Sequence, residues 1–312
     1  MRAIRVERFG GPEALRVVSV EAPAPSPGEV LVRVVAAGVN PVDWKVRAGG
    51  AGERFGRPPY VPGWDVAGVV EATGDGVSAF AAGDEVFGMP RFPEPAGCYA
   101  DYLCAPADHL AAAPAGMDRV ATAGLPMAGL TALQVLDLVG VTDGQRVLVH
   151  AAAGGVGHLA VQLAKARGAY VIGTSRADKH PFLHELGIDE AVDYTTVAFE
   201  EAIVDVDVVV NLVSGDYDRR SLRVLRPGGV LAMIVAGGGE ALAAAAEAAG
   251  VRVERHLVRP DRQGLARLAE LAGRGGLRVA VEHVFPLEQA PRAHELGERG
   301  HTRGKIVLAV AD

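Results

Sequence analysis

The chain has 312 residues, which is too long for one average domain and about right for two. It carries 31 Lys and Arg against 38 Asp and Glu, a net charge of −7, so no overall positive field exists to attract nucleic acid. Its two cysteines, Cys98 and Cys104, cannot form a four-thiolate zinc site and predict free thiols in a reducing compartment. The N-terminal residues alternate charged and apolar side chains and lack the apolar core of a signal peptide, so we expect a cytoplasmic protein without a membrane segment.

The first part of the chain is predicted to be a β domain. Short apolar or alternating runs, separated by Gly and Pro, predict strands at residues 2–6, 15–20, 29–37, 66–72 and 83–88. The proline-rich connector at residues 22–28 excludes a helix between the second and third strands. Short strands broken by turn residues are typical of a barrel or sandwich.

The hydrophobic period changes near residue 121, where apolar residues recur at helical spacing over residues 124–140. Strands then alternate with helices. Strands are predicted at residues 146–150, 170–174, 191–193, 206–213, 229–235 and 251–258, and helices at 155–167, 179–186 and 240–249. Runs of Val, Ile and Leu are what a parallel sheet buried on both faces requires, so this part is predicted to be a doubly wound α/β domain. After residue 261 come a helix, a strand at 277–284, a second helix and a strand at 305–310, and the pattern alone does not assign this tail to a domain.

The strongest motif lies at residues 147–158, Val-Leu-Val-His-Ala-Ala-Ala-Gly-Gly-Val-Gly-His. A strand, a glycine turn and a helix follow one another there, as a dinucleotide fingerprint requires. In the G-x-G-x-x-G frame the positions are Ala152, Gly154 and Gly157, so Ala152 departs from the first glycine. Gly154 would let the backbone approach a pyrophosphate, Gly157 would let helix and strand pack closely, and the helix N-terminus would offer free N–H groups. A tight structural turn is the alternative interpretation.

The end of the next predicted strand favours NADP(H) over NAD(H). NAD sites usually carry an acidic residue at this strand tip, and the tip here has none. Ser175, Arg176 and Lys179 could instead donate hydrogen bonds to a 2′-phosphate. Asp178 is expected in the first turn of the following helix, where its charge suits the helix dipole.

Six motifs together resemble the medium-chain dehydrogenase/reductase superfamily, and within it the zinc-independent quinone oxidoreductase branch. They are residues 38–43 (Gly-Val-Asn-Pro-Val-Asp), 62–70, 83–88, 129–132, 151–157 and 300–307. The resemblance covers essentially the whole chain. It implies a GroES-like β-barrel catalytic domain made of residues 1–120 and 261–312, with a Rossmann NADP-binding domain of parallel sheet inserted at residues 121–260.

The resemblance also indicates that zinc plays no part. The zinc alcohol dehydrogenases of this superfamily carry a metal-binding Cys where this chain has Asn40 and a His where it has Trp64, while Asp65 matches the acidic residue that follows that His. An amide and an indole cannot replace a thiolate and an imidazole as zinc ligands. We therefore expect no metal.

Without a Lewis acid, the chemistry implied is hydride transfer from NADPH to a quinone or an α,β-unsaturated carbonyl (enone). Charge then collects on the carbonyl oxygen, so the protein needs positioning and a hydrogen-bond donor there. Asn40 is the candidate for positioning, through its amide to the nicotinamide ribose or the substrate carbonyl. Asp43 is expected to be a buried orienting carboxylate, with Lys45 or Arg47 as its partner. The alternative for Asn40 and Asp43 is a purely structural Asn-Pro turn.

The resemblance implies further residues near the cofactor: Thr131, Gly155, Val156, Tyr194, Leu212, Val213, Ser214, Val235, Ala236, Thr302, Arg303 and Lys305. A substrate wall is expected beside residues 89–97, where Trp44, Tyr60 and Trp64 are the nearest aromatic side chains. His150 and His158 flank the phosphate turn and are expected to be structural.

The leading hypothesis is therefore an NADPH-dependent reductase of quinones or enones. One alternative is an NADP(H)-binding redox sensor or partner protein without turnover, and another is an enoyl-thioester reductase that acts in trans on a carrier protein. The strand at residues 251–258 would end the parallel sheet with an exposed apolar edge, and pairing of this edge across a two-fold axis predicts a homodimer.

Overall fold

The computed structural model describes residues 1–50, 52–234 and 239–311 of the chain. The chain divides into two compact units. Unit 1 contains residues 1–130 and 259–312, and unit 2 contains residues 131–258. The C-terminal tail thus returns to the unit that the N-terminal part builds, and the unit boundaries lie close to the predicted ones at residues 121 and 260.

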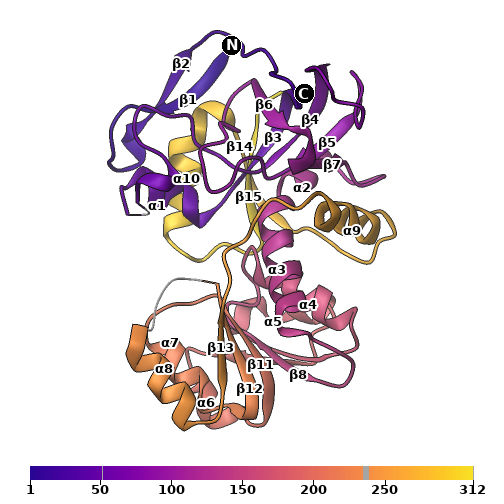
Figure 1. Cartoon of the computed structure of the whole chain (residues 1–312). Helices are drawn as coiled ribbons and strands as arrows, with labels where there is room; N and C mark the ends of the chain where they lie inside the picture. The colour runs from indigo at the N-terminus through magenta and orange to yellow at the C-terminus, as the bar shows by residue number, and fades with distance from the viewer. Residues whose placement is uncertain (51, 235–238, 312) are drawn as a thin grey trace. The chain divides into compact units, whose positions relative to one another are not determined.

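Unit 1 is organised around a seven-stranded sheet with the order β14-β15-β3-β4-β5-β7, and β6 also pairs with β3. Its strands are β3 (Glu29–Val39), β4 (Val66–Thr73), β5 (Glu85–Gly88), β6 (Tyr102–Pro106), β7 (Leu110–Ala112), β14 (Val281–Pro286) and β15 (Lys305–Ala309). A separate hairpin consists of β1 (Arg2–Val6) and β2 (Leu15–Ser19). Figure 1 shows the C-terminal strands, in yellow, among the indigo and purple N-terminal ones. The predicted β domain is confirmed, although β6 and β7 were not anticipated and β14 begins later than expected.

Strand β3 holds the centre of this sheet. One edge of β3 pairs with β4 along most of its length. The other edge is shared by β6, which pairs with residues 29–33, and by β15, which pairs with residues 36–39. Strands from both ends of the chain therefore share one core.

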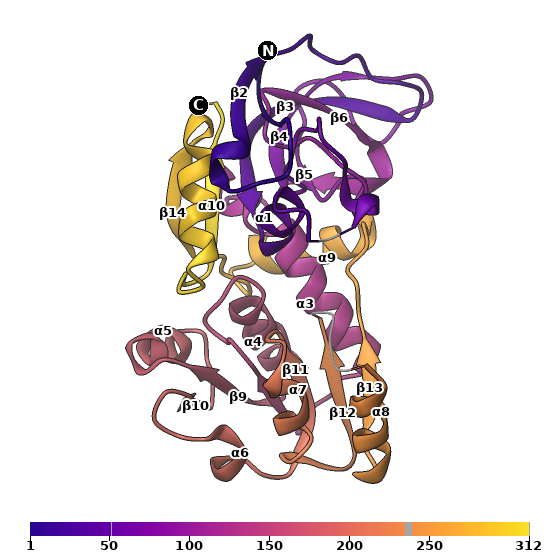
Figure 2. The same ribbon diagram turned by 90° about the vertical axis from the view of Figure 1, so that its left-hand side faces the viewer.

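The helices of unit 1 are α1 (Pro41–Arg47), α2 (Arg119–Ala123), α9 (Arg262–Gly273) and α10 (Ala290–Glu298), and α3 (Pro126–Val139) begins in this unit and ends in unit 2. Figure 2 shows α10 lying along β14. Helix α1 was not predicted, and the structural alternative considered for Asn40 and Asp43 was an Asn-Pro turn. Pro41 instead starts a helix, where its fixed φ and missing N–H cost nothing, and the Asp43 carboxylate accepts the Asn40 N–H at 2.6 Å.

A chain of buried polar side chains links α10 to α1. The Arg47 guanidinium contacts Nδ1 of His294 at 3.4 Å, Nε2 of His294 contacts the Tyr99 hydroxyl at 3.3 Å, and this hydroxyl donates to Asp43 at 3.2 Å. A guanidinium only donates, so Nδ1 accepts and the imidazole proton lies on Nε2. Every donor in the chain then points towards Asp43.

The prediction that Lys45 or Arg47 is the direct partner of Asp43 is therefore wrong. Lys45 is exposed, and Arg47 donates to the Gly10 carbonyl and forms an ion pair with Glu298. Arg47 reaches Asp43 only through His294 and Tyr99.

Burial shifts the pKa values of His294 and Asp43 in this chain in opposite senses. The His294 imidazole is fully buried, and this burial lowers its pKa to about 3. Burial raises the pKa of Asp43 to about 7, and its Oδ1 atom has no hydrogen-bond partner in the described part of the chain. His294 is therefore neutral in the folded protein, and Asp43 keeps its proton up to a pH far above the usual pKa of an aspartate.

Unit 2 contains a six-stranded parallel sheet with the order β10-β9-β8-β11-β12-β13. The strands are β8 (Arg146–Val149), β9 (Tyr170–Ser175), β10 (Glu190–Asp193), β11 (Val206–Asn211), β12 (Leu225–Met233) and β13 (Arg252–Arg255), and the helices are α4 (Gly157–Lys165), α5 (His180–Glu185), α6 (Phe199–Ala202), α7 (Asp216–Ser221) and α8 (Gly239–Ala248). Counted within the unit, the order is 3-2-1-4-5-6, which is that of the dinucleotide-binding fold. The predicted doubly wound domain is confirmed. The order reverses between β8 and β11, so a ligand is expected at the carboxyl ends of these strands.

His150 lies at this carboxyl edge and contacts residues from two neighbouring elements, β9 and α7. It follows β8, its Nδ1 lies 3.1 Å from the Thr174 hydroxyl, and its Nε2 lies 3.0 Å from the Ser221 hydroxyl. Its ring packs edge-on against Phe199 at 4.6 Å. Burial lowers the pKa of His150 to about 3, so it is a neutral structural residue, as predicted.

Strand β13 lies at the edge of the parallel sheet, as expected, but it is short and charged. It contains four residues, Arg-Val-Glu-Arg, and the expected apolar edge is therefore wrong. Alternating charges of this kind are common on edge strands because they discourage unspecific pairing. No helix in the described ranges has both the length and the apolar character needed to cross a membrane.

The buried chain of unit 1 predicts two variants with opposite dependence on pH. Between about pH 4 and 6.5, unfolding lets His294 bind a proton and lets Asp43 lose one, so their contributions to the free energy of unfolding oppose each other. Relative to the wild type, His294→Gln should gain stability as the pH falls through this window, and Asp43→Asn should lose stability, each by up to about 1.4 kcal/mol per pH unit.

Urea unfolding followed by tryptophan fluorescence measures this effect in unit 1, because Trp44 and Trp64 are the chain's two tryptophans and both lie there. Parallel pH profiles for the wild type and both variants would contradict the assignment.

Candidate functional site

The phosphate turn of unit 2 bends the chain sharply from β8 into α4. Ala151 adopts a positive φ of 48°, and the Ala152 N–H donates to the Thr174 carbonyl at 3.0 Å. The Gly154 carbonyl accepts the His158 N–H at 3.0 Å and lies 2.9 Å from Nδ1 of the same histidine. Among the described contacts, the N–H groups of Gly155, Val156 and Gly157 have no acceptor, so the start of α4 is suited to an anionic phosphate. His158 fixes the turn, as its structural interpretation predicted.

Two glycines explain how the turn tolerates Ala152. A Cβ atom at Gly157 would lie 2.8 Å from the Ala152 Cα atom, so only glycine lets α4 approach the strand end. The Ala152 methyl group is buried, and a Cβ atom at Gly173 on β9 would lie 2.6 Å from it. The glycine missing from the fingerprint at position 152 is therefore compensated by the glycine on the neighbouring strand.

The residues expected at a 2′-phosphate lie together at the ends of β9 and β10. Ser175 ends β9, and its hydroxyl donates to the Arg176 carbonyl at 3.1 Å. The Arg176 side chain is half exposed and 3.9 Å from the Asp178 carboxylate. Lys179 closes the short 3-10 turn that follows, and Tyr194 is an exposed residue directly after β10. One exposed cation, Arg176, one partly buried cation, Lys179, and one exposed aromatic ring, Tyr194, thus lie at the ends of these strands.

Sequence reasoning missed the carboxylate of Asp193 in the same corner. Asp193 stands opposite Ser175 in the parallel register of β9 and β10. It accepts the Thr195 hydroxyl at 2.7 Å and the Thr195 N–H at 2.9 Å, and these bonds lower its pKa. The signal was present, because Asp193 is the last residue of the next short strand.

The other expected cofactor residues are spread over both units. Residues 212–214 follow β11 at the point where the strand order reverses, and the Val213 N–H donates to the Asn211 side chain at 3.1 Å. Thr131 is buried on α3. Val235 and Ala236 lie outside the described residues. In unit 1 the buried Thr302 hydroxyl lacks a described partner, and the Arg303 N–H donates to Glu282 at 2.7 Å.

A compact polar cluster in unit 1 contains Asn40, Asp65 and Lys305, all less than 4% exposed. The Lys305 ammonium donates to Oδ1 of Asn40 and lies 3.3 Å from Oδ2 of Asp65. The Asn40 amide nitrogen donates to the same carboxylate oxygen at 2.8 Å, and Oδ1 of Asp65 accepts the Met127 N–H at 2.7 Å. Lys305 was expected to reach over the cofactor, and its bonds in the structure go to these two side chains.

Sheet topology explains why residues so distant in sequence meet. Asn40 follows β3, Asp65 precedes β4 and Lys305 begins β15, and β3 lies between the other two strands. The register places Ile306 opposite Val39, so Lys305 comes beside Asn40. A Cβ atom at Gly38 would lie 2.7 Å from Oδ2 of Asp65, so glycine is needed for this close approach.

The residues of this cluster do not fit a zinc ion. Asn40 offers an amide, and the positive ammonium of Lys305 lies between Asn40 and Asp65, where it would repel a metal cation. The described residues contain no group of three or more His, Cys, Asp or Glu side chains that could hold a metal ion.

The aromatic residues expected to form a substrate wall belong to two different clusters. Trp64 is buried, donates its indole N–H to the Glu94 carbonyl at 2.8 Å and packs edge-on against Phe92. Tyr60 is nearly buried, and its hydroxyl has no hydrogen-bond partner in the described part of the chain. Trp44 packs instead against His294 on α10. The ring contacts of Trp44 and Trp64 are thus with different partners, His294 and Phe92.

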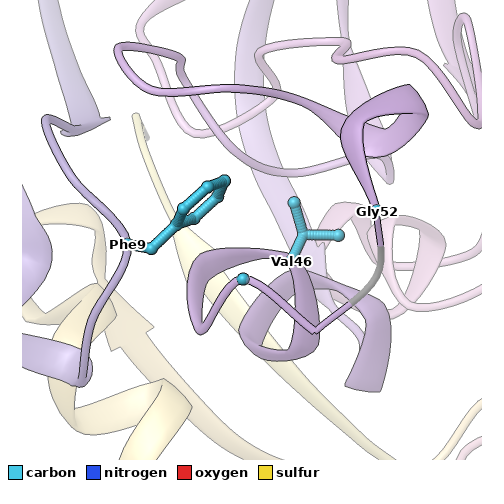
Figure 3. A pocket seen from close by; sticks show the side chains of 4 residues that line it. Phe9, Val46 and Gly52 are labelled. Atoms are coloured by element: carbon cyan, nitrogen blue, oxygen red, sulfur yellow. The ribbon is translucent and has the colours of Figure 1, made fainter.

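Figure 3 shows a small pocket of unit 1 in which the Phe9 ring faces Val46 on α1. Its lining consists of Phe9, Val46, Gly49 and Gly52, which offer no polar side chain. Such a lining cannot orient a carbonyl group, so we assign the pocket no role in the reaction.

Comparison with known proteins places both units in one family. Residues 26–115 match the alcohol dehydrogenase GroES-like domain, and residues 186–308 match the family described as zinc-binding dehydrogenase. The chain is 34% identical to the quinone oxidoreductase of Sus scrofa, with 99% of this chain and 97% of the relative covered. It is 35% identical to a 2-haloacrylate reductase of a Burkholderia species, with 97% of each covered.

Solved structures agree over the same length. The quinone oxidoreductase of Coxiella burnetii has a TM-score of 0.94 at 36% identity, with 99% of each chain covered. The Escherichia coli quinone oxidoreductase, solved as a complex with NADPH, has a TM-score of 0.90 at 29% identity and covers 99% of this chain and all of its own. Since these matches span both units, the chain belongs to the medium-chain dehydrogenase/reductase superfamily, in its quinone oxidoreductase branch.

Proposed function

We propose that the protein is an NADPH-dependent, zinc-independent reductase that transfers hydride to a quinone or an α,β-unsaturated carbonyl. The observation that carries this proposal is the buried Asn40 amide, which is held by a cation and a carboxylate in a cluster unsuited to a metal. The phosphate turn of unit 2 supports the cofactor. The names of the relatives, quinone oxidoreductase and 2-haloacrylate reductase, both denote reductases of electrophilic unsaturated compounds.

When bound, the nicotinamide cofactor supplies the hydride, and the protein has to hold the reactants and stabilise charge. The start of α4 binds the pyrophosphate through its N–H groups. Arg176, which is exposed, and Lys179, which is partly buried, would bind the 2′-phosphate at the end of β9. Asn40 donates a hydrogen bond to the substrate carbonyl oxygen, where negative charge develops as hydride arrives at the conjugated carbon. The Asp43 carboxylate accepts a hydrogen bond from the Asn40 N–H and thereby fixes the backbone at Asn40.

We also propose that the substrate is a small molecule and that the protein works in the cytoplasm. Cys98 is buried and Cys104 is half-buried, and both are free thiols. Burial raises the pKa of each thiol, which keeps both protonated and unreactive. Free thiols of this kind suit a reducing compartment.

Turnover is tested by NADPH oxidation with a panel of quinones, enones and enoyl thioesters. We expect a decrease in NADPH absorbance with quinones or enones, and a loss of about 100-fold or more in kcat for Asn40→Ala, since one donor to a developing oxyanion is worth about 10²–10³. Tight NADPH binding without turnover of any compound would favour a sensor, and turnover of thioesters alone would favour the enoyl-thioester reductase.

Cofactor choice is tested with Arg176→Ala. Loss of one charge-assisted contact to the 2′-phosphate should weaken NADPH binding by about 10- to 100-fold and leave NADH binding unchanged. Fluorescence titration measures both dissociation constants. The matched control is Arg226→Ala, because Arg226 is similarly exposed and paired with Asp207 at the opposite end of the sheet. Equal losses for NADPH and NADH would refute the assignment.

We propose a homodimer in which β13 pairs with its counterpart in a second copy. An antiparallel pair centred on Val253 would place Arg252 of one copy opposite Glu254 of the other, so the charged edge is complementary to itself. Light scattering should give twice the mass of one chain for the wild type and the mass of one chain for Arg252→Glu. The swapped variant Arg252→Glu/Glu254→Arg should restore the dimer, whereas a monomeric wild type would exclude it.

A further inference from the structure

The orientation of the Asn40 amide follows from the chemistry of its two partners. The two ends of an amide have nearly the same shape, so partners decide which end is oxygen. The Lys305 ammonium can only donate and the Asp65 carboxylate can only accept, so Oδ1 faces Lys305 and Nδ2 faces Asp65. One Nδ2 hydrogen is thus used by Asp65. The second has no acceptor among the described contacts.

Lys305 changes what this remaining hydrogen can do. A cation bound to the amide oxygen draws electron density from the nitrogen, and hydrogen bonds in such a chain strengthen one another. The same ammonium neutralises Asp65, whose negative charge would otherwise oppose charge on a nearby substrate oxygen. Burial of both charged groups keeps these effects from being screened by water.

We propose that Lys305 is a positioning residue that acts through Asn40: it holds the amide and polarises its free N–H group, so that this group binds the substrate carbonyl oxygen as charge develops. The inference rests on the proposed reductase function. It differs from a role of Lys305 in cofactor binding, since the bonds of the ammonium go to Asn40 and Asp65.

A double-mutant cycle on the full chain separates the two roles. Lys305→Met should lower kcat by about 10- to 100-fold, because it weakens the single donor to the developing charge. The KM for the quinone should change less than kcat, and the dissociation constant for NADPH, measured by fluorescence, should stay within about twofold. In the Asn40→Ala background, Lys305→Met should cause no further loss of kcat.

Conservative and neutral variants keep the test decisive. Lys305→Arg retains a charged donor and should keep most of the wild-type kcat. The charge-balanced variant Asp65→Asn/Lys305→Met avoids an unpaired buried carboxylate, so we expect it to fold even where Lys305→Met fails to fold. It should show the same loss of kcat. Lys165→Met is the matched control, because Lys165 also pairs with an aspartate, Asp189 in unit 2, and should leave kcat unchanged.

Two results would overturn the inference. Equal losses of kcat from Lys305→Met with and without Asn40 would mean that Lys305 does not act through the amide. A large rise in the NADPH dissociation constant with unchanged kcat would mean that Lys305 binds the cofactor. Both results require a wild type that turns over, so they are distinct from failure of the proposed function, in which the wild type itself would not oxidise NADPH.

Discussion

The polar groups at the end of β3 depend on the buried ion pair between Lys305 and Asp65. Removing two charges from water costs free energy, and removing only one partner of such a pair usually destabilises a protein by about 3–5 kcal/mol. Here the remaining lone pairs are used, because Asp65 also accepts the Met127 N–H and the Asn40 amide. The pair therefore connects the first residue of β15, the residue before β4, the start of α1 and the start of α3. A sheet built from both ends of the chain is what allows these groups to meet.

The two units hold charge by different physical means. In unit 2, the groups suited to negative charge are backbone N–H groups at the start of α4 and side chains that remain in water, such as Arg176. In unit 1, side chains are taken out of water and fixed by one another, so that the Asn40 amide has one defined orientation. The first arrangement suits phosphate groups that are charged throughout, and the second suits charge that exists only briefly during a reaction.

Much of the fold could be predicted from the sequence, because periodic patterns are local. Runs such as residues 206–211 predict buried parallel strands, and Gly154 and Gly157 mark the turn that leads into α4. The partners of Arg47 and Lys305 could not be predicted in this way, since Glu298 and Asn40 lie hundreds of residues from them and are brought close only by the sheet order. Helix α1 was missed because Asn-Pro marks both a turn and the first residues of a helix, and the Asp43 cap distinguishes them only in three dimensions.

The chain of donors that runs from Arg47 through His294 and Tyr99 to Asp43 also bears on proton supply. Reduction of a quinone or an enone consumes a proton in addition to the hydride. A proton given up by Asp43 could be replaced from Tyr99, and Tyr99 from Nε2 of His294, but Nδ1 of His294 would then need a proton from Arg47. A guanidinium does not release protons in proteins, so Arg47 cannot supply a proton to His294. The buried chain therefore holds Asp43 in place but cannot pass it protons from Arg47.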